Sequence, residues 1–179
     1  SVYDPRMGCV QTGDTLGQVC ATCNADIWSC SGHFGVIELN TPIILFHKQV
    51  VTLLRCVCLS CFRLLNTTKT HKSFAAAVEF LSNLSGCQTC GEPVAEVKYV
   101  AGDVSIQCVK RGPNKEKIVS ELQPQFIKRV FDTLPDSDAR LLCLNLELVH
   151  PRNYVLTKFP VIPTCCRPKT LMGDSVTDD

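Results

Sequence analysis

The sequence predicts an irregular α+β fold, with a few helices and short antiparallel strands, stabilised by clustered cysteines. Apolar residues recur at helical spacing in some segments and alternate in others, and 13 of the 179 residues are cysteine. Hydrophobic residues make up 45% and charged residues 20%, which is typical of a folded globular protein. No apolar run reaches the roughly 18–20 residues that cross a bilayer.

Four segments have the apolar spacing or the start signals of helices. Residues 46–57 place apolar side chains at i, i+4, i+7, i+8 and i+11, which is one helical face. Residues 73–84 repeat this pattern, with Ser73 as the expected N-cap. Pro124 suits the first turn of a third helix, and a short fourth helix is expected to begin near Ser137.

The remaining segments favour strands and extended chain. "FGVIELNTPI" alternates like a strand that ends at Pro42, and residues 94–122 alternate in the same way. We therefore expect residues 94–160 to contain the strands and the later helices. Residues 161–179 are expected to form an extended, proline-containing segment with a loose acidic tail, "GDSVTDD".

The cysteines occur in closely spaced pairs, as three C-x2-C turns and one C-x2-H turn. One C-x2-C turn brings two side chains to one point, and a second turn completes a tetrahedron, the arrangement that zinc prefers. The turns divide into a compact loop over residues 20–33 and a split set over residues 58–90 with a helix inserted between its halves. The predicted zinc ligands are Cys20, Cys23, Cys30 and His33 in the first set, and Cys58, Cys61, Cys87 and Cys90 in the second.

Both ligand sets are complete, so no position remains for water or substrate and both zinc ions are predicted to be structural. Zinc would then contribute folding free energy, and chelation should loosen the fold. We expect Trp28 to cover the first site. The cysteines outside the two sets are expected to be small buried apolar residues; they are Cys9, Cys56, Cys108, Cys143, Cys165 and Cys166.

Other uses of the cysteines fit less well. Two N-x-[ST] sequons would suit a secreted disulfide protein, but the cysteine count is odd and no signal-peptide pattern is present. A redox C-x2-C turn belongs to an α/β pattern that is missing here. A zinc deaminase needs H-x-E and P-C-x2-C, which do not occur, and no single cysteine stands out as a protease nucleophile.

Motifs along nearly the whole chain resemble those of one family. "CATCNADIWSCSGHFGVIELNTPI" is similar to the N-terminal clamp region of the largest subunit of multi-subunit DNA-directed RNA polymerases, of the eukaryotic, archaeal and large-DNA-virus type. "DPRMG" resembles the D-x-R-[LM]-G that precedes it, and "FPVIPTCCRP" resembles the closing P-V-x-P-x3-R-P segment. "CVCLSCFRLL" is similar to C-x-C-x2-C-x2-L-L, which implies ligand roles for Cys58 and Cys61 and none for Cys56.

The resemblance implies a mechanical function for residues 1–179. They would form part of the clamp that holds template DNA and the RNA–DNA hybrid, beside the second-largest and smaller polymerase subunits. The family's N-D-F-D-G-D magnesium loop is not in the sequence, so we expect a fragment of a longer protein that is inactive alone and binds no magnesium. The expected location is intracellular, in the nucleus or, for a viral enzyme, in the infected cell or the virion. "HPRNYVL" and "TCC" depart from the usual motifs and favour a viral enzyme.

A net charge of +1 excludes a free-standing nucleic-acid binder with a strongly basic face. Any contact with DNA is expected from scattered basic residues that meet phosphates, with Arg6, Lys110, Arg111 and Arg167 as candidates. The alternative function is a stand-alone zinc-ribbon adaptor for protein–protein contacts. A RING-type site is disfavoured because it interleaves its ligand sets, whereas here the first set closes before the second begins.

Overall fold

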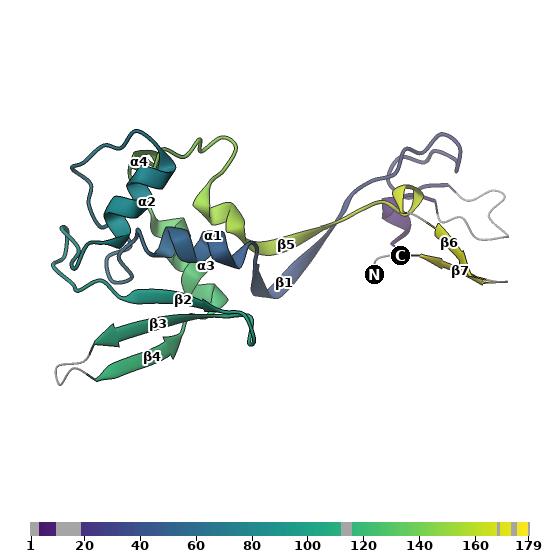
Figure 1. Ribbon diagram of the computed structural model, residues 1–179. Helices are drawn as coiled ribbons and strands as arrows, with labels where there is room; N and C mark the ends of the chain where they lie inside the picture. Colours follow the sequence, from purple (N-terminus) through teal and green to yellow (C-terminus); the bar gives the residue numbers. More distant parts are fainter. Residues whose placement is uncertain (1–3, 10–18, 112–115, 168, 173–174, 179) are drawn as a thin grey trace. The chain divides into compact units, whose positions relative to one another are not determined.

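The computed structural model describes residues 4–9, 19–111, 116–167, 169–172 and 175–178. It divides the chain into two compact units, one of residues 1–39 and 158–179 and the other of residues 40–157. Strands β1 and β5 pair with each other, and each continues from one unit into the other (Figure 1). None of the helices in the described ranges has the length and apolar character needed to span a membrane.

The order of elements confirms the predicted α+β class, with short helices and small antiparallel sheets. The first half contains η1 (Pro5–Met7), β1 (Gly35–Ile44), α1 (His47–Leu54), α2 (Phe74–Ser82), β2 (Glu96–Val100) and β3 (Ser105–Arg111). The second half contains β4 (Lys117–Glu121), α3 (Pro124–Thr133), α4 (Asp136–Leu141), η2 (Pro151–Tyr154), β5 (Val155–Val161), η3 (Thr164–Cys166), β6 (Lys169–Met172) and β7 (Ser175–Asp178).

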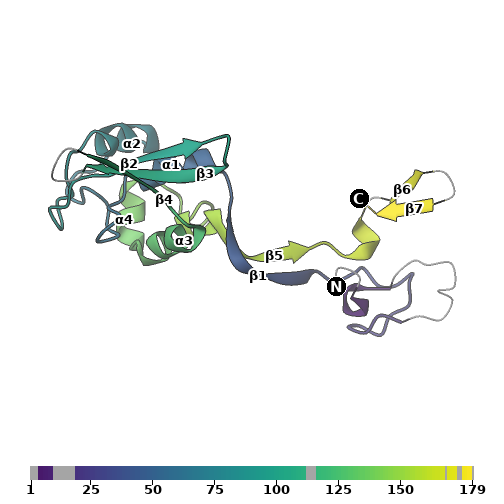
Figure 2. The same ribbon diagram turned by 90° about the horizontal axis from the view of Figure 1, so that it is seen from below.

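The unit of residues 40–157 is built around the antiparallel sheet β2-β3-β4. Helices α1 and α3 lie on one face of this sheet (Figures 1 and 2). Val97 of β2 and Ile106 of β3 are buried, as are Ile127 and Phe131 of α3. The alternation predicted for residues 94–122 is therefore the alternation of a half-buried antiparallel sheet.

Helix α1 is shorter than the apolar spacing predicted. It begins at His47 and ends at Leu54, whereas Phe46 lies before it with φ 51° and is 65% exposed. The ring of Phe46 instead contacts Tyr154 edge-on, with the ring centroids 6.2 Å apart. The helix ends early because the chain turns at Cys56, whose N–H donates to Leu53, and enters the second cysteine set.

Ser73 caps α2 as the sequence predicted: its Oγ accepts a hydrogen bond from the N–H of Ala76 at 3.3 Å. We expect Ser73→Ala to lower the free energy of unfolding by about 1 kcal/mol, because this N–H would lose its partner at the helix start. Urea unfolding of the metal-loaded chain measures this change. Ser82→Ala, at the other end of α2, is the matched control, and an equal loss in both variants would contradict the capping role.

Two expectations about the extended segments were wrong. Strand β1 continues past Pro42 to Ile44, because among the described residues it pairs with β5 alone in a two-stranded sheet, and an edge position tolerates proline. The acidic tail was expected to be loose, but its residues Ser175–Asp178 form β7, which pairs antiparallel with β6. The other residues of that tail lie outside the described ranges.

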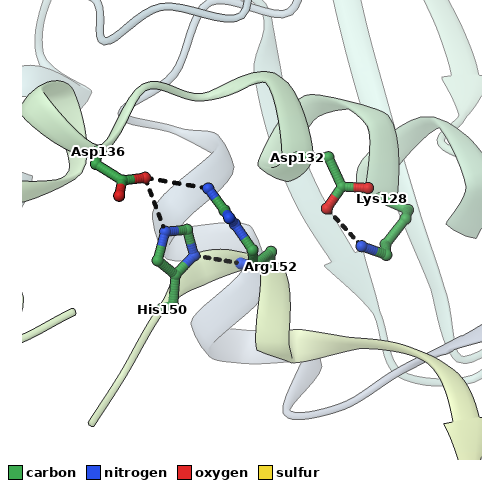
Figure 3. A network of polar contacts seen from close by, with 5 residues as sticks. All are labelled: Lys128, Asp132, Asp136, His150 and Arg152. Atoms are coloured by element: carbon green, nitrogen blue, oxygen red, sulfur yellow. Dashed lines mark hydrogen bonds and ion pairs between the residues drawn. The ribbon is translucent and has the colours of Figure 1, made fainter. Parts of the chain in front are cut away.

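A polar network fixes the chain between α4 and β5 (Figure 3). His150 is buried, and its Nδ1 accepts a hydrogen bond from the N–H of Arg152 at 3.2 Å, which caps η2. Its Nε2 lies 3.3 Å from Oδ1 of Asp136, and Nη2 of Arg152 lies 3.0 Å from the same oxygen. Since Nδ1 is the acceptor, Nε2 carries the proton that points at Asp136. The pair of Lys128 and Asp132 is a separate contact along α3.

Candidate metal centres

The three C-x2-C turns have the same backbone conformation. In each, the N–H of the first cysteine donates to the carbonyl five residues later, and its carbonyl accepts from the N–H four residues later. The first cysteines of these turns are Cys20, Cys58 and Cys87. The residue four positions on has a positive φ each time: Asn24 at 56°, Phe62 at 59° and Gly91 at 73°. This left-handed residue lets the chain reverse, so that both thiols of the turn point to one side.

The first cluster brings together Cys20, Cys23, Cys30 and His33, with their ligand atoms all within 4.8 Å of one another. The Sγ atoms of Cys23 and Cys30 are 3.6 Å apart, and Sγ of Cys30 is 3.7 Å from Nε2 of His33. Cys20 is buried, whereas Cys23 is exposed. The cluster therefore lies at the surface of its unit, with one thiol inside.

Segments from both ends of the chain hold the first cluster. Met7 accepts a hydrogen bond from the N–H of His33 at 2.9 Å, and the hydroxyl of Thr22 donates to Arg6 at 2.6 Å. At the other side, Gly32 has φ 84°, and a Cβ there would lie 2.5 Å from Sγ of Cys165. Only glycine adopts this φ readily and has no Cβ to clash. Residue 32 therefore allows the "TCC" segment to pack directly against the cysteine loop.

The second cluster brings together Cys58, Cys61, Cys87 and Cys90, whose Sγ atoms also lie within 4.8 Å of one another. The distances from Cys58 to Cys90 and from Cys61 to Cys87 are 3.6 and 3.7 Å. Cys58 and Cys87 are buried in the same apolar core as Leu64 and Leu81. This cluster therefore joins two turns that are far apart in sequence to the core of their unit.

Both clusters have the dimensions of a tetrahedral zinc site. Four sulfurs placed about 2.3 Å from a central ion are about 3.8 Å from one another, and an imidazole nitrogen shortens this edge slightly. The observed separations of 3.6–3.7 Å match these edges. All-thiolate and three-thiolate, one-imidazole ligand sets are those of structural zinc. Either cluster could therefore hold a zinc ion with no open coordination position.

Backbone N–H groups favour the thiolate form of two cysteines. The N–H groups of Cys23 and Thr22 point at the sulfur of Cys20 and lower its pKa to about 6, against the effect of burial. Burial also raises the pKa of Cys87, but the N–H groups of Cys90 and Thr89 outweigh it and lower the value to about 7. The deprotonated form is the one that binds metal. In the same clusters the pKa values of Cys23, Cys61 and Cys90 are raised, so without metal one thiolate is favoured in each cluster rather than all of them.

A buried carboxylate holds the turn that carries Cys61. Asp138 of α4 is 1% exposed and accepts hydrogen bonds from Arg63, at 2.7 and 2.9 Å, and from the N–H of Leu64 at 3.1 Å. Burial raises the pKa of Asp138, but the Arg63 guanidinium and this N–H lower it by more. The net effect is a pKa below the ordinary value of an aspartate. No local pattern in the sequence indicates this contact, because α4 lies far along the chain from Arg63.

The cysteines outside the clusters divide into two groups. Cys9, Cys56 and Cys108 are buried, as predicted, and burial raises the pKa of the Cys56 thiol to about 12. The prediction was wrong for Cys143, Cys165 and Cys166, which are exposed. The expectation that Trp28 covers the first site was also wrong, because its side chain is 90% exposed in the described structure.

The four basic residues suggested for nucleic-acid contact do not form one group. Arg6 and Arg167 belong to one unit, and Lys110 and Arg111 to the other. Arg6 forms an ion pair with Asp4 at 2.7 Å, and Arg167 donates to the carbonyl of Ile162 at 3.0 and 3.1 Å. Lys110 is exposed, while the side chain of Arg111 lies outside the described part of the chain.

Comparison with known proteins decides the family. The model of the family "RNA polymerase Rpb1, domain 1" matches residues 1–179. The chain belongs to this family. A protein of Invertebrate iridescent virus 6, named as a homolog of DNA-directed RNA polymerase II subunit RPB1, is 31% identical over all of the chain. Subunit Rpo1N of the DNA-directed RNA polymerase of Methanocaldococcus jannaschii is 30% identical over 99% of the chain.

A third relative, from Frog virus 3 and named as a DNA-directed RNA polymerase, is 34% identical over 94% of the chain. The chain spans 19%, 13% and 14% of the lengths of the iridescent virus, frog virus and archaeal relatives. This Rpb1 domain 1 sequence therefore corresponds to a small part of each relative. The resemblance stated from the cysteine motifs is confirmed, and it includes viral, archaeal and eukaryotic polymerases.

Proposed function

We propose that this Rpb1 domain 1 chain is a structural part of the clamp of a DNA-directed RNA polymerase. It helps to hold template DNA and the RNA–DNA hybrid, next to the second-largest and smaller subunits. The observation that carries the proposal is the pair of closed four-ligand clusters within a chain of this family. A closed site cannot activate a substrate, but it can keep loops at fixed positions.

In this proposal, each cluster binds one zinc ion through four of the eight residues predicted from the sequence. Zinc supplies a cross-link that resists deformation of the turns. Cys20, Cys23, Cys30 and His33 stiffen the loop that lies against Met7, and the second set fixes its two turns in the core. The reacting groups and the magnesium ions belong to other parts of the enzyme, so the isolated chain transfers no nucleotides.

Nucleic-acid contacts by this chain are electrostatic and independent of sequence in this proposal. Lys110, Arg111, Arg6 and Arg167 remain its candidates, each meeting a phosphate rather than a base edge. The separation of these residues over two units suits scattered contacts along a duplex better than one basic patch. Binding of this kind weakens steeply as salt is added.

The test uses the complete polymerase carrying Cys23→Ser in this segment, with Cys143→Ser as a control at an exposed cysteine outside the clusters. Addition of a single nucleotide on a preformed template–RNA scaffold should be unchanged by either variant. The lifetime of the elongation complex in added salt should fall about tenfold for Cys23→Ser only, equivalent to about 1.4 kcal/mol. If single-nucleotide addition fell as much as the lifetime of the elongation complex, the segment would have a role in catalysis instead. If the lifetime of the elongation complex were unchanged, the clamp role would be contradicted.

A further inference from the structure

We propose that Cys165 and Cys166 form a third metal site in this chain, an open one that binds a tetrahedral divalent ion of the zinc type through two thiolates. Both side chains are exposed, and both belong to the short turn η3. Their Sγ atoms lie 3.8 Å apart. Neither residue belongs to the two clusters described above, so the closed metal centres do not account for this pair.

The distance between the two sulfurs indicates which kind of ion fits. Two thiolates on one tetrahedral ion, each about 2.3 Å from the metal, are about 3.8 Å apart. Cys165 and Cys166 have this separation, and the sulfur pairs inside the two clusters, at 3.6–3.7 Å, are close to it. A linear two-coordinate ion would place its sulfurs about 4.6 Å apart, which is twice the metal–sulfur bond. The pair therefore matches one edge of a zinc tetrahedron.

A disulfide between the two cysteines is the main alternative, and the backbone disfavours it. Their peptide bond is trans, and consecutive Cα atoms are then about 3.8 Å apart. Disulfides usually join Cα atoms that are about 4.4–6.8 Å apart. A bond between these neighbours would therefore be strained, whereas a metal ion can bridge the sulfurs at the distance that they already have.

Neighbouring segments hold the two sulfurs in position. Sγ of Cys165 donates to the carbonyl of Ser31 at 3.4 Å, and a Cβ on Gly32 would lie 2.5 Å from the same sulfur. The N–H of Cys166 donates to the carbonyl of Pro163 at 3.0 Å within the turn. The pair is thus fixed against the loop of the first cluster, in the same unit of the chain. An ion that binds there does not have to order a mobile segment first.

The coordination sphere of this site is open, unlike those of the two clusters. In the described ranges, no third cysteine, histidine or carboxylate has a ligand atom within 4.8 Å of both sulfurs. Water or a small thiol would complete the tetrahedron. Partial burial of its sulfur, and then the neighbouring Cys166 sulfur, raise the pKa of the Cys165 thiol, so the ion must displace a proton. We therefore expect this ion to be bound more weakly than the other two and to exchange with solution.

The test counts zinc ions in the purified chain by native mass spectrometry at neutral pH, first with zinc in excess and then after a weak chelator. The unmodified chain should hold three ions in excess zinc and two after the chelator, because only the open site exchanges readily. Cys165→Ser and Cys166→Ser should each hold two ions under both conditions. Cys143→Ser, the matched control at a single exposed cysteine, should still bind the third ion.

Two outcomes of this count would overturn the proposal. The first is a third ion that both serine variants retain, which would be an adventitious ion only, held by another surface group. The second is an unmodified chain that holds no more ions in excess zinc than the serine variants do. The comparison does not depend on the two clusters, because the expected difference of one ion remains even if a cluster holds no zinc.

Alkylation in the complete polymerase locates the third ion. The thiolate is both the nucleophile and the metal ligand of a cysteine, so a bound ion competes with alkylation by iodoacetamide. Added zinc should therefore protect Cys165 and Cys166 in the intact enzyme, while the rate of alkylation at Cys143 should not change. Equal alkylation of the pair with and without added zinc would contradict a metal site in the enzyme.

Discussion

Replacing Cys61 by serine is expected to remove one zinc ion from the chain and to unfold the unit of residues 40–157. The second cluster joins two turns to the apolar core, and Cys58 and Cys87 are themselves part of that core. Structural zinc contributes about 10–16 kcal/mol of apparent binding free energy. This is comparable to the whole stability of most domains, about 5–15 kcal/mol, so we expect this unit to unfold when the ion is lost. Native mass spectrometry counts the ions, and circular dichroism follows the fold.

Cys23→Ser is the informative comparison for this variant. Cys23 belongs to the first cluster and is exposed, and its unit has few buried side chains. We expect Cys23→Ser to remove the other ion while β2, β3 and α3 keep their structure. Cys143→Ser should keep both ions, because Cys143 lies outside both clusters. If Cys61→Ser retained both ions, or if Cys143→Ser lost one, the assignment of ligands would be contradicted.

Asp138→Ala should have the second large effect. The substitution leaves the N–H of Leu64 buried without an acceptor and removes the partner of Arg63. Removing one member of a buried ion pair costs about 3–5 kcal/mol, but the Arg63 side chain is 41% exposed and can recover water. We therefore expect a loss of about 2–3 kcal/mol in the free energy of unfolding, measured by urea unfolding with zinc bound.

The control for Asp138→Ala is Asp132→Asn. Asp132 pairs with Lys128 at the surface of α3, and exposed pairs contribute less than about 1 kcal/mol. Asp138→Asn separates charge from hydrogen bonding: one amide oxygen cannot accept from both Arg63 and Leu64, so most of the loss should remain. A loss no larger than that of Asp132→Asn would show that α4 does not stabilise the Cys61 turn.

The pH dependence of the same contact has a definite sign. The pKa of Asp138 is lowered on folding, so its stabilising contribution is complete above the ordinary value of 3.8 and is lost as the pH falls below it. Ligand thiolates also become protonated in acid and release zinc. The comparison of Asp138→Ala with the unmodified chain is therefore best made near neutral pH, where both are metal-loaded.

Local patterns predicted the local structure well. The apolar spacing after Pro124 gave α3, with Ile127, Val130 and Phe131 buried, and Ser73 was correctly expected at the start of α2. Cysteine spacing identified all eight residues that the structure gathers into two clusters. These features succeed because each depends on residues that are near one another in sequence, where geometry follows from the period of the helix or the turn.

Contacts between distant segments could not be predicted in the same way. The pairing of β1 with β5 and the contact of Arg63 with Asp138 join residues separated by most of a unit. Cys165 also lies against Gly32 and Ser31, which are far away in sequence, and no local pattern indicates this contact. Phe46 carried the right apolar spacing but lies outside α1, because its positive φ and its contact with Tyr154 place it before the helix.

The sequence carries a further signal for the conformation of the three C-x2-C turns. The residue directly after each C-x2-C pair is Asn24, Phe62 or Gly91, and all three adopt a positive φ. Asparagine and glycine favour that conformation, and they indicate a tight turn when they follow such a pair. Phe62 is the exception, and its ring contacts that of Phe126 edge-on, with the ring centroids 5.9 Å apart.

The most direct test of the central claim is X-ray absorption at the zinc edge of the purified chain. Two ions held by the two clusters share seven sulfur ligands and one imidazole nitrogen. The spectrum should therefore show a first shell dominated by sulfur at about 2.3 Å, with a small nitrogen component near about 2.0 Å. A shell rich in oxygen or nitrogen, or a chain without zinc, would contradict the account of two structural metal centres.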